Sequence, residues 1–110
     1  MAYDEQLADR VRDLVAGKEG LTQQRMFGGL AFLINGNMAV AASGQGGLLV
    51  RVDAADGDVW IKEEGVMPMV MRGREMHGWL RIVTDLTDPE LEQWVSRGVA
   101  YARSLPPKGT

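Results

Sequence analysis

His77 is the only histidine of the chain and the first residue to consider for chemistry, because its ordinary pKa lies near neutrality. A histidine that acts as a base also needs a nucleophile and an acid that orients it. Arg25 and a carboxylate could complete such a site, but no motif supplies a nucleophile at a fixed spacing from His77. The pattern favours a polar strand residue over a catalytic base. We therefore expect a protein that is not an enzyme, with a small enzyme or ligand-binding domain as the alternative.

Metal and disulfide chemistry have little support in the composition. The 110 residues include no cysteine, which excludes disulfides, thiolate nucleophiles and cysteine-bound metals. Zinc would have to combine His77 with carboxylates at no recognisable spacing. Asp53, Asp56 and Asp58 are spaced like part of a calcium loop, but no bidentate glutamate follows at the required position. We expect no catalytic residue, no metal and no other cofactor.

Four arginines on or beside expected strands, Arg51, Arg72, Arg74 and Arg81, could form a basic patch for phosphate or for an acidic partner. The alternative is a solvated sheet face paired with the acids of residues 53–64. The net charge of −3 argues against strong direct nucleic-acid binding, which needs clustered lysine and arginine.

The ends and the apolar runs of the chain suggest no membrane contact. The N-terminus is acidic and is not a signal peptide, and no stretch approaches the roughly 20 apolar residues of a membrane span. We expect a cytoplasmic protein.

The first half of the chain predicts one helix and three strands. Asp4 is a good N-cap and Gly17 a natural stop for an amphipathic helix between them. Strands are expected over residues 25–34, 38–42 and 48–52. Asn35-Gly36 is a strong signal for a type I′ hairpin turn between the first two. Gly28-Gly29, within the first strand, indicates a bulge or a close backbone approach.

The second half predicts a short helix over residues 53–66, weakened by Gly57 by roughly 1 kcal/mol relative to alanine. A hairpin follows over residues 69–72 and 76–83. The last helix begins at a capping box, Thr87 to Glu90, and ends before Pro106-Pro107. The order α-β-β-β-α-β-β-α predicts a two-layer α+β fold with a five-stranded antiparallel sheet. We expect one domain over residues 1–110, with a frayed tail at 106–110.

The segment Arg25-Met26-Phe27-Gly28-Gly29 is short but distinctive, and it follows an amphipathic helix. With Asn35-Gly36-Asn37-Met38, Pro68-Met69 and the final helix bearing Trp94, it resembles the N-terminal domain of TfoX/Sxy regulators over nearly the whole chain. This resemblance implies a two-layer α+β domain and a single-domain member of the family. The namesakes regulate natural competence and act with the cyclic-AMP receptor protein at promoters. The resemblance therefore implies a regulatory or protein-interaction module with a transcription regulator as partner.

The distinctive segment is the first candidate for an interaction site. Its functional interpretation is a docking edge where the first helix meets the sheet, and Arg25 is the residue that packing explains least. Met26 and Phe27 could instead be core residues of a bulged strand, in which Gly28 and Gly29 permit close packing.

A surface for self-association is the second candidate. Helices on one side of the sheet would leave the other face open, where alternation places Trp79 with Arg81 on one strand and Arg51 on another. Such a patch usually marks an interface, most often of a two-fold dimer, with arginines at the rim that can stack on tryptophan. Methionines between residues 67 and 76 could add adaptable contacts or fill the core. The alternative is that the second helix covers this face through Val59 and Trp60.

Overall fold

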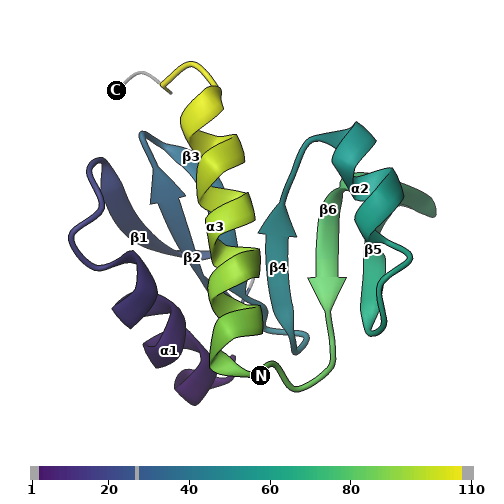
Figure 1. The fold of residues 1–110 in the computed structure, drawn as a ribbon, viewed down its shortest axis with the longest axis horizontal. Coiled ribbons are helices and arrows are strands. Elements are labelled where there is room, and N and C mark those ends of the chain that lie inside the picture. Colours follow the sequence, from purple (N-terminus) through teal and green to yellow (C-terminus); the bar gives the residue numbers. More distant parts are fainter. Residues whose placement is uncertain (1–2, 27, 108–110) are drawn as a thin grey trace.

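The computed structural model describes residues 3–26 and 28–107. These residues form three helices on one face of an antiparallel sheet of six strands, ordered β1-β2-β3-β4-β6-β5 (Figure 1). No helix among the described residues is long and apolar enough to span a membrane. The elements follow the chain as α1 (Glu5–Val15), β1 (Leu21–Met26), β2 (Gly29–Ile34), β3 (Asn37–Ala42), β4 (Leu48–Arg51), α2 (Ala54–Trp60), β5 (Val66–Met71), β6 (Arg74–Ile82) and α3 (Asp88–Ser104). The predicted α+β class is confirmed, with six strands instead of five.

The additional strand arises because the segment predicted as one strand over residues 25–34 is divided at Gly28 and Gly29. The prediction of a bulge there is wrong, whereas the alternative of a close backbone approach is confirmed at Gly29. β1 and β2 are separate strands, and Gly28 lies between them with a φ of 77°, which favours glycine. Gly29 is close to another backbone, since a Cβ there would lie 3.0 Å from the amide nitrogen of Gly44. β1 is an exposed, polar edge strand, so it lacks the hydrophobic alternation that marks a strand in sequence. Phe27 lies outside the described residues.

Both long helices begin at the predicted caps. The Asp4 side chain accepts a hydrogen bond from the Leu7 amide at 3.1 Å, and Gly17 follows α1 with a φ of 82°. In α3, the Glu90 amide donates to the Thr87 hydroxyl at 3.3 Å, and the Thr87 amide donates to the Glu90 carboxylate at 2.9 Å. Local side-chain chemistry therefore sets where these helices begin.

The short helix α2 lies on the same face of the sheet as α1 and α3. Trp60 packs edge-to-face against Trp94 of α3, with ring centroids 6.0 Å apart, and the Arg97 guanidinium stacks on both rings. Val59, the other residue through which this helix could cover the far face of the sheet, is 63% exposed. The alternative in which α2 covers the open face of the sheet is therefore wrong.

The main core lies between the sheet and the helices. The four adjacent strands β2, β3, β4 and β6 each place a fully buried residue there: Phe32, Val40, Val50 and Leu80. Neighbouring residues on three of these strands point to the other face, where they form a second buried cluster of Ala31, Leu33, Ala41 and Leu49. Among the described residues, the partly buried hydrophobic side chains that pack against this second cluster are Met26, Met38 and Met69, which all come from strands. We call this side of the sheet the open face.

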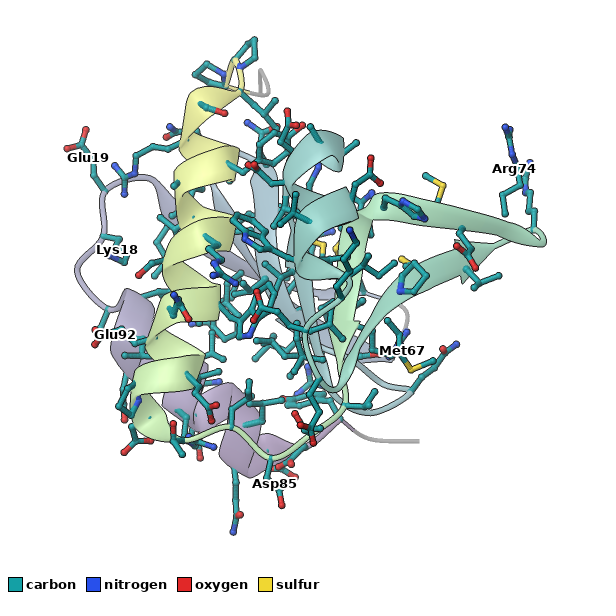
Figure 2. All side chains as sticks on the ribbon, turned by 45° about the vertical axis from the view of Figure 1, so that its right-hand side comes forward. Lys18, Glu19, Met67, Arg74, Asp85 and Glu92 are labelled. Atoms are coloured by element: carbon teal, nitrogen blue, oxygen red, sulfur yellow. The ribbon has the colours of Figure 1, made fainter. Side chains whose placement is uncertain are left out.

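The β5–β6 hairpin projects from the molecule, with Arg74 near its tip (Figure 2). Its register shifts at Pro68. Pro68 pairs with Leu80, whereas the next residue, Met69, pairs with Met76, so residues 77–79 of β6 have no partner on β5. Proline has no backbone N–H to donate to the ladder, so a bulge is expected at such a position. The bulge removes residues 77–79 from pairing with β5 and leaves the side chains of His77 and Trp79 to contact other elements.

Candidate functional site

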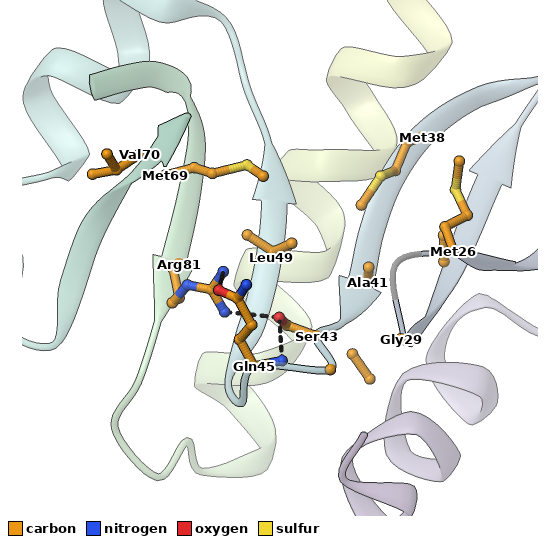
Figure 3. A pocket seen from close by; sticks show the side chains of 13 residues that line it. Met26, Gly29, Met38, Ala41, Ser43, Gln45, Leu49, Met69, Val70 and Arg81 are labelled. Atoms are coloured by element: carbon orange, nitrogen blue, oxygen red, sulfur yellow. Dashed lines mark hydrogen bonds between the residues drawn. The ribbon is translucent and has the colours of Figure 1, made fainter. Parts of the chain in front are cut away.

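The open face carries an apolar pocket of about 120 Å³ (Figure 3). Its lining comes from all six strands, and the apolar part includes Met26, Ala31, Met38, Ala41, Leu49 and Met69. Ala31 and Ala41 are only 1% and 5% exposed, although they lie on the face of the sheet away from the three described helices. The three methionines, which are partly buried against this cluster, shield them. We call this hollow the methionine pocket.

A bulge in β3 brings the pocket residues to one face. Ala31 pairs with Ala41, and Leu33 pairs with Met38, so two steps along β2 correspond to three steps along β3. Without the extra residue, Met38 and Ala41 would point to opposite faces, because side chains alternate along a strand. The small side chains of Ala31 and Ala41 then leave room between the flanking methionines.

Arg81 of β6 forms the polar side of the pocket, together with the turn between β3 and β4. Its Nη1 donates to the Ser43 hydroxyl at 2.8 Å and to the Gly46 carbonyl at 2.7 Å, and its Nη2 donates to the Gln45 side-chain oxygen at 3.2 Å. Arg81 is the only charged residue among the described residues that line the pocket. The pocket therefore combines an apolar floor with one fixed cation at its rim.

The predicted candidate residues separate into different places. Met26 and Gly29 of the distinctive segment line the methionine pocket together with Arg81. Arg25 precedes Met26 on β1, so its side chain points to the opposite face of the strand. It is exposed, in a hollow beside the start of α1. The sequence analysis did not identify Ala31, Met38 and Ala41 as site residues, because their common face depends on the pairing register of β2 and β3.

Arg51 and Trp79 form a separate stack at the end of β4. The guanidinium carbon of Arg51 lies 5.1 Å from the Trp79 ring centroid and 5.7 Å from that of Tyr101 in α3. Arg51 therefore links the sheet to α3 through cation–π contacts. Among residues 3–26 and 28–107, no ion pair joins Arg51 or Arg81 to an acid of the 53–64 segment. The expected pairing of these two arginines with that segment is not found.

His77 lies between two carboxylates. Its Nδ1 is hydrogen-bonded to Asp58 of α2, and its Nε2 lies 3.2 Å from the Glu75 carboxylate. The hydrogen bond to Asp58 raises the pKa of His77 above its ordinary value, and that to Glu75 raises it further. A protonated imidazole donates from both nitrogens, so it has no lone pair to accept a proton from a substrate.

Arg25 and His77 do not share a site. Arg25 is on β1 and His77 on β6, with β2, β3 and β4 between them. Four strand spacings of about 4.8 Å separate the two strands by roughly 19 Å. The residues of the enzyme alternative therefore lie on distant parts of the sheet.

Protonated His77 is expected to stabilise the folded state in mildly acidic solution. Because the folded protein raises its pKa, this contribution is fully present below the ordinary pKa of 6.5 and is lost as the pH rises through the folded pKa. The Cε1 proton of this single histidine, followed by NMR in an untagged chain, should titrate with a midpoint above 6.5. Asp58→Asn should lower the midpoint more than Glu75→Gln. A wild-type midpoint at or below the ordinary value would contradict the paired geometry.

Comparison with known protein families identifies one matching domain. A model of the TfoX N-terminal domain matches residues 13–102. This range contains all six strands and every residue of the methionine pocket. A search of curated proteins and a search of solved structures found no significant match.

Proposed function

Because the chain belongs to the TfoX N-terminal domain family, we propose that it is a non-enzymatic regulatory module that docks a protein partner on the open face of its sheet. The methionine pocket carries this proposal, since it is an apolar hollow on the sheet face away from the helices. Apolar patches with polar rims are typical of interaction sites, and methionine side chains adapt to different partners.

The size of the pocket supports a protein partner over a small molecule. Its volume of about 120 Å³ is below the roughly 300–1,000 Å³ of small-molecule sites. It is close to the roughly 150 Å³ that hold a benzene ring. One bulky side chain of a partner therefore suits it.

The first partner to test is a transcription regulator related to the cyclic-AMP receptor protein, as the family resemblance implies. The proposed role is transcription regulation, including competence, in the cytoplasm. Direct nucleic-acid binding has little support, because the net charge is −3 and Arg81 is the only charged residue among the described residues that line the pocket, whereas phosphate binding needs clustered cations. A homodimer through the open face is the second arrangement to test, since it would cover the same apolar surface.

We expect the purified chain to bind the purified regulator, and Ala41→Arg to weaken that binding at least about tenfold. An arginine at this position can extend into the pocket and would displace a partner's side chain. Val59→Arg is the matched control, because it adds the same charge at a residue 63% exposed on the helical side. Isothermal titration calorimetry measures the binding, and circular dichroism checks that both variants fold.

Several results would contradict this function. Binding that Ala41→Arg leaves unchanged would exclude the open face as the docking site. Equal losses in both variants would indicate a general effect of charge. Tight, strongly salt-dependent DNA binding by the isolated chain would favour direct nucleic-acid recognition. Sedimentation equilibrium of the wild type at tens of micromolar tests the homodimer.

A further inference from the structure

We propose that the partner segment entering the methionine pocket carries a bulky apolar side chain next to a carboxylate, and that Arg81 binds this carboxylate. The inference rests on the proposed docking function and specifies the chemistry of the partner. It depends on how the Arg81 guanidinium is held and on the charges around it.

The Arg81 guanidinium is fixed in place by neutral acceptors. Three of its five N–H groups donate to Ser43, Gly46 and Gln45, at 2.8, 2.7 and 3.2 Å. The Nε–H and one hydrogen of Nη2 have no acceptor among the described residues. The group is therefore oriented before any partner arrives, and it retains donors for an additional ligand (Figure 3).

The charge of Arg81 has no counterpart at the pocket. No ion pair involving Arg81 is present in the described part of the chain, and none of the described residues lining the pocket is acidic. A partner that covers the pocket would remove this cation from water, which is unfavourable unless the partner supplies an opposite charge. Arginine suits this role because its planar fork matches the geometry of a carboxylate.

A second copy of this chain does not supply the opposite charge that Arg81 requires. A two-fold dimer centred on the pocket joins the same patch of both copies, so the groups nearest the axis face their own equivalents. The described lining residues of the pocket offer no carboxylate for the opposing guanidinium. Charge complementarity therefore favours a different protein with an acidic, apolar segment.

Short capped peptides can test this chemistry by NMR on the full isotope-labelled chain. The probe is acetyl-Gly-Phe-Asp-Gly-amide, compared with the same peptide carrying Asn for Asp or Ala for Phe. We expect the Phe-Asp peptide to shift the amide signals of Ala31, Ala41 and Leu49, with a dissociation constant in the millimolar range. Each altered peptide should bind about tenfold more weakly, because it loses either the charge-assisted hydrogen bond or the apolar contact.

Two variants assign the preference for aspartate to Arg81. Arg81→Met should remove the difference between the Asp and Asn peptides, whereas Arg74→Met, near the hairpin tip, should retain it. Gln45→Glu is a second variant that keeps Arg81 and the shape of the turn. It places a carboxylate where the Gln45 oxygen accepts from Nη2, so it should also abolish the preference.

The outcomes separate this inference from the docking function. Equal binding of the Asp and Asn peptides, abolished by Ala41→Arg, would overturn the carboxylate requirement and leave the docking face in place. No binding of the Phe-Asp peptide at about 10 mM would overturn the inference. Phenylacetate binding as tightly as the peptide, with the same dependence on Arg81, would indicate a small-molecule acid and overturn the partner class. A wild-type dimer that buries the pocket would identify a second copy as the occupant.

Discussion

Phe32→Ala is expected to lower the free energy of unfolding by about 3–5 kcal/mol, the usual loss when a buried aromatic ring is truncated. Phe32 is completely buried on β2, where it pairs with Val40 of β3 and lies beneath the helices. The close-packed surroundings can collapse only partly into the space of the ring, so a cavity remains. A domain of this size has about 5–15 kcal/mol in total, so the variant would be close to unfolding.

Guanidinium chloride denaturation followed by far-UV circular dichroism measures this loss. Val70→Ala is the control, because Val70 is 61% exposed and its truncation should change stability by less than about 0.5 kcal/mol. A Phe32→Ala variant as stable as this control would show that the ring does not lie in the core.

Gly57→Ala is expected to destabilise the protein by roughly 1–3 kcal/mol, although alanine is the better helix former. In an exposed helix this substitution would stabilise by about 1 kcal/mol. At Gly57, however, an added Cβ would overlap the carbonyl oxygen of His77 and lie 2.8 Å from its carbonyl carbon. The methyl group can be accommodated only if α2 moves away from β6, which would weaken the Trp60–Trp94 contact.

The sign of the change in stability is the decisive observation for Gly57. Asp56→Ala is the matched control, because its side chain is exposed on the same helix and should change stability by less than about 0.5 kcal/mol. The stabilities of both variants are compared by thermal unfolding, followed by tryptophan fluorescence and circular dichroism. A Gly57→Ala variant more stable than the wild type would show that α2 does not pack this closely.

The two faces of the sheet differ in how their residues are packed. Stability resides mainly between the sheet and the helices, where Phe32, Val50 and Leu80 are fully buried. The methionine pocket lies on the opposite side, lined by small and flexible residues. Substitutions on the open face leave the contacts of the main core in place, and circular dichroism separates a change in docking from a loss of fold.

The sequence by itself determined the features that depend on neighbours along the chain. The caps at Asp4 and Thr87 set the starts of α1 and α3, because each side chain binds an amide within the first turn. Asn35 and Gly36 both adopt positive φ, as a type I′ turn requires, and this turn joins β2 to β3. These local signals were sufficient for the α+β class, and the Arg25 to Gly29 segment identified the family.

Only the tertiary structure decided the features that depend on residues far apart in the chain. The β3 bulge brings Met38 and Ala41 to one face, and it can be seen only once β3 is paired with β2. Gly57 looks like a weakness in a short helix until the backbone of His77 is placed against it. Arg81 was already a candidate from its position on a strand, but its fixed orientation at the pocket depends on a turn more than thirty positions earlier, which supplies its neutral acceptors. Alternation and propensity carry no information on such pairings, since register and packing arise from the whole sheet.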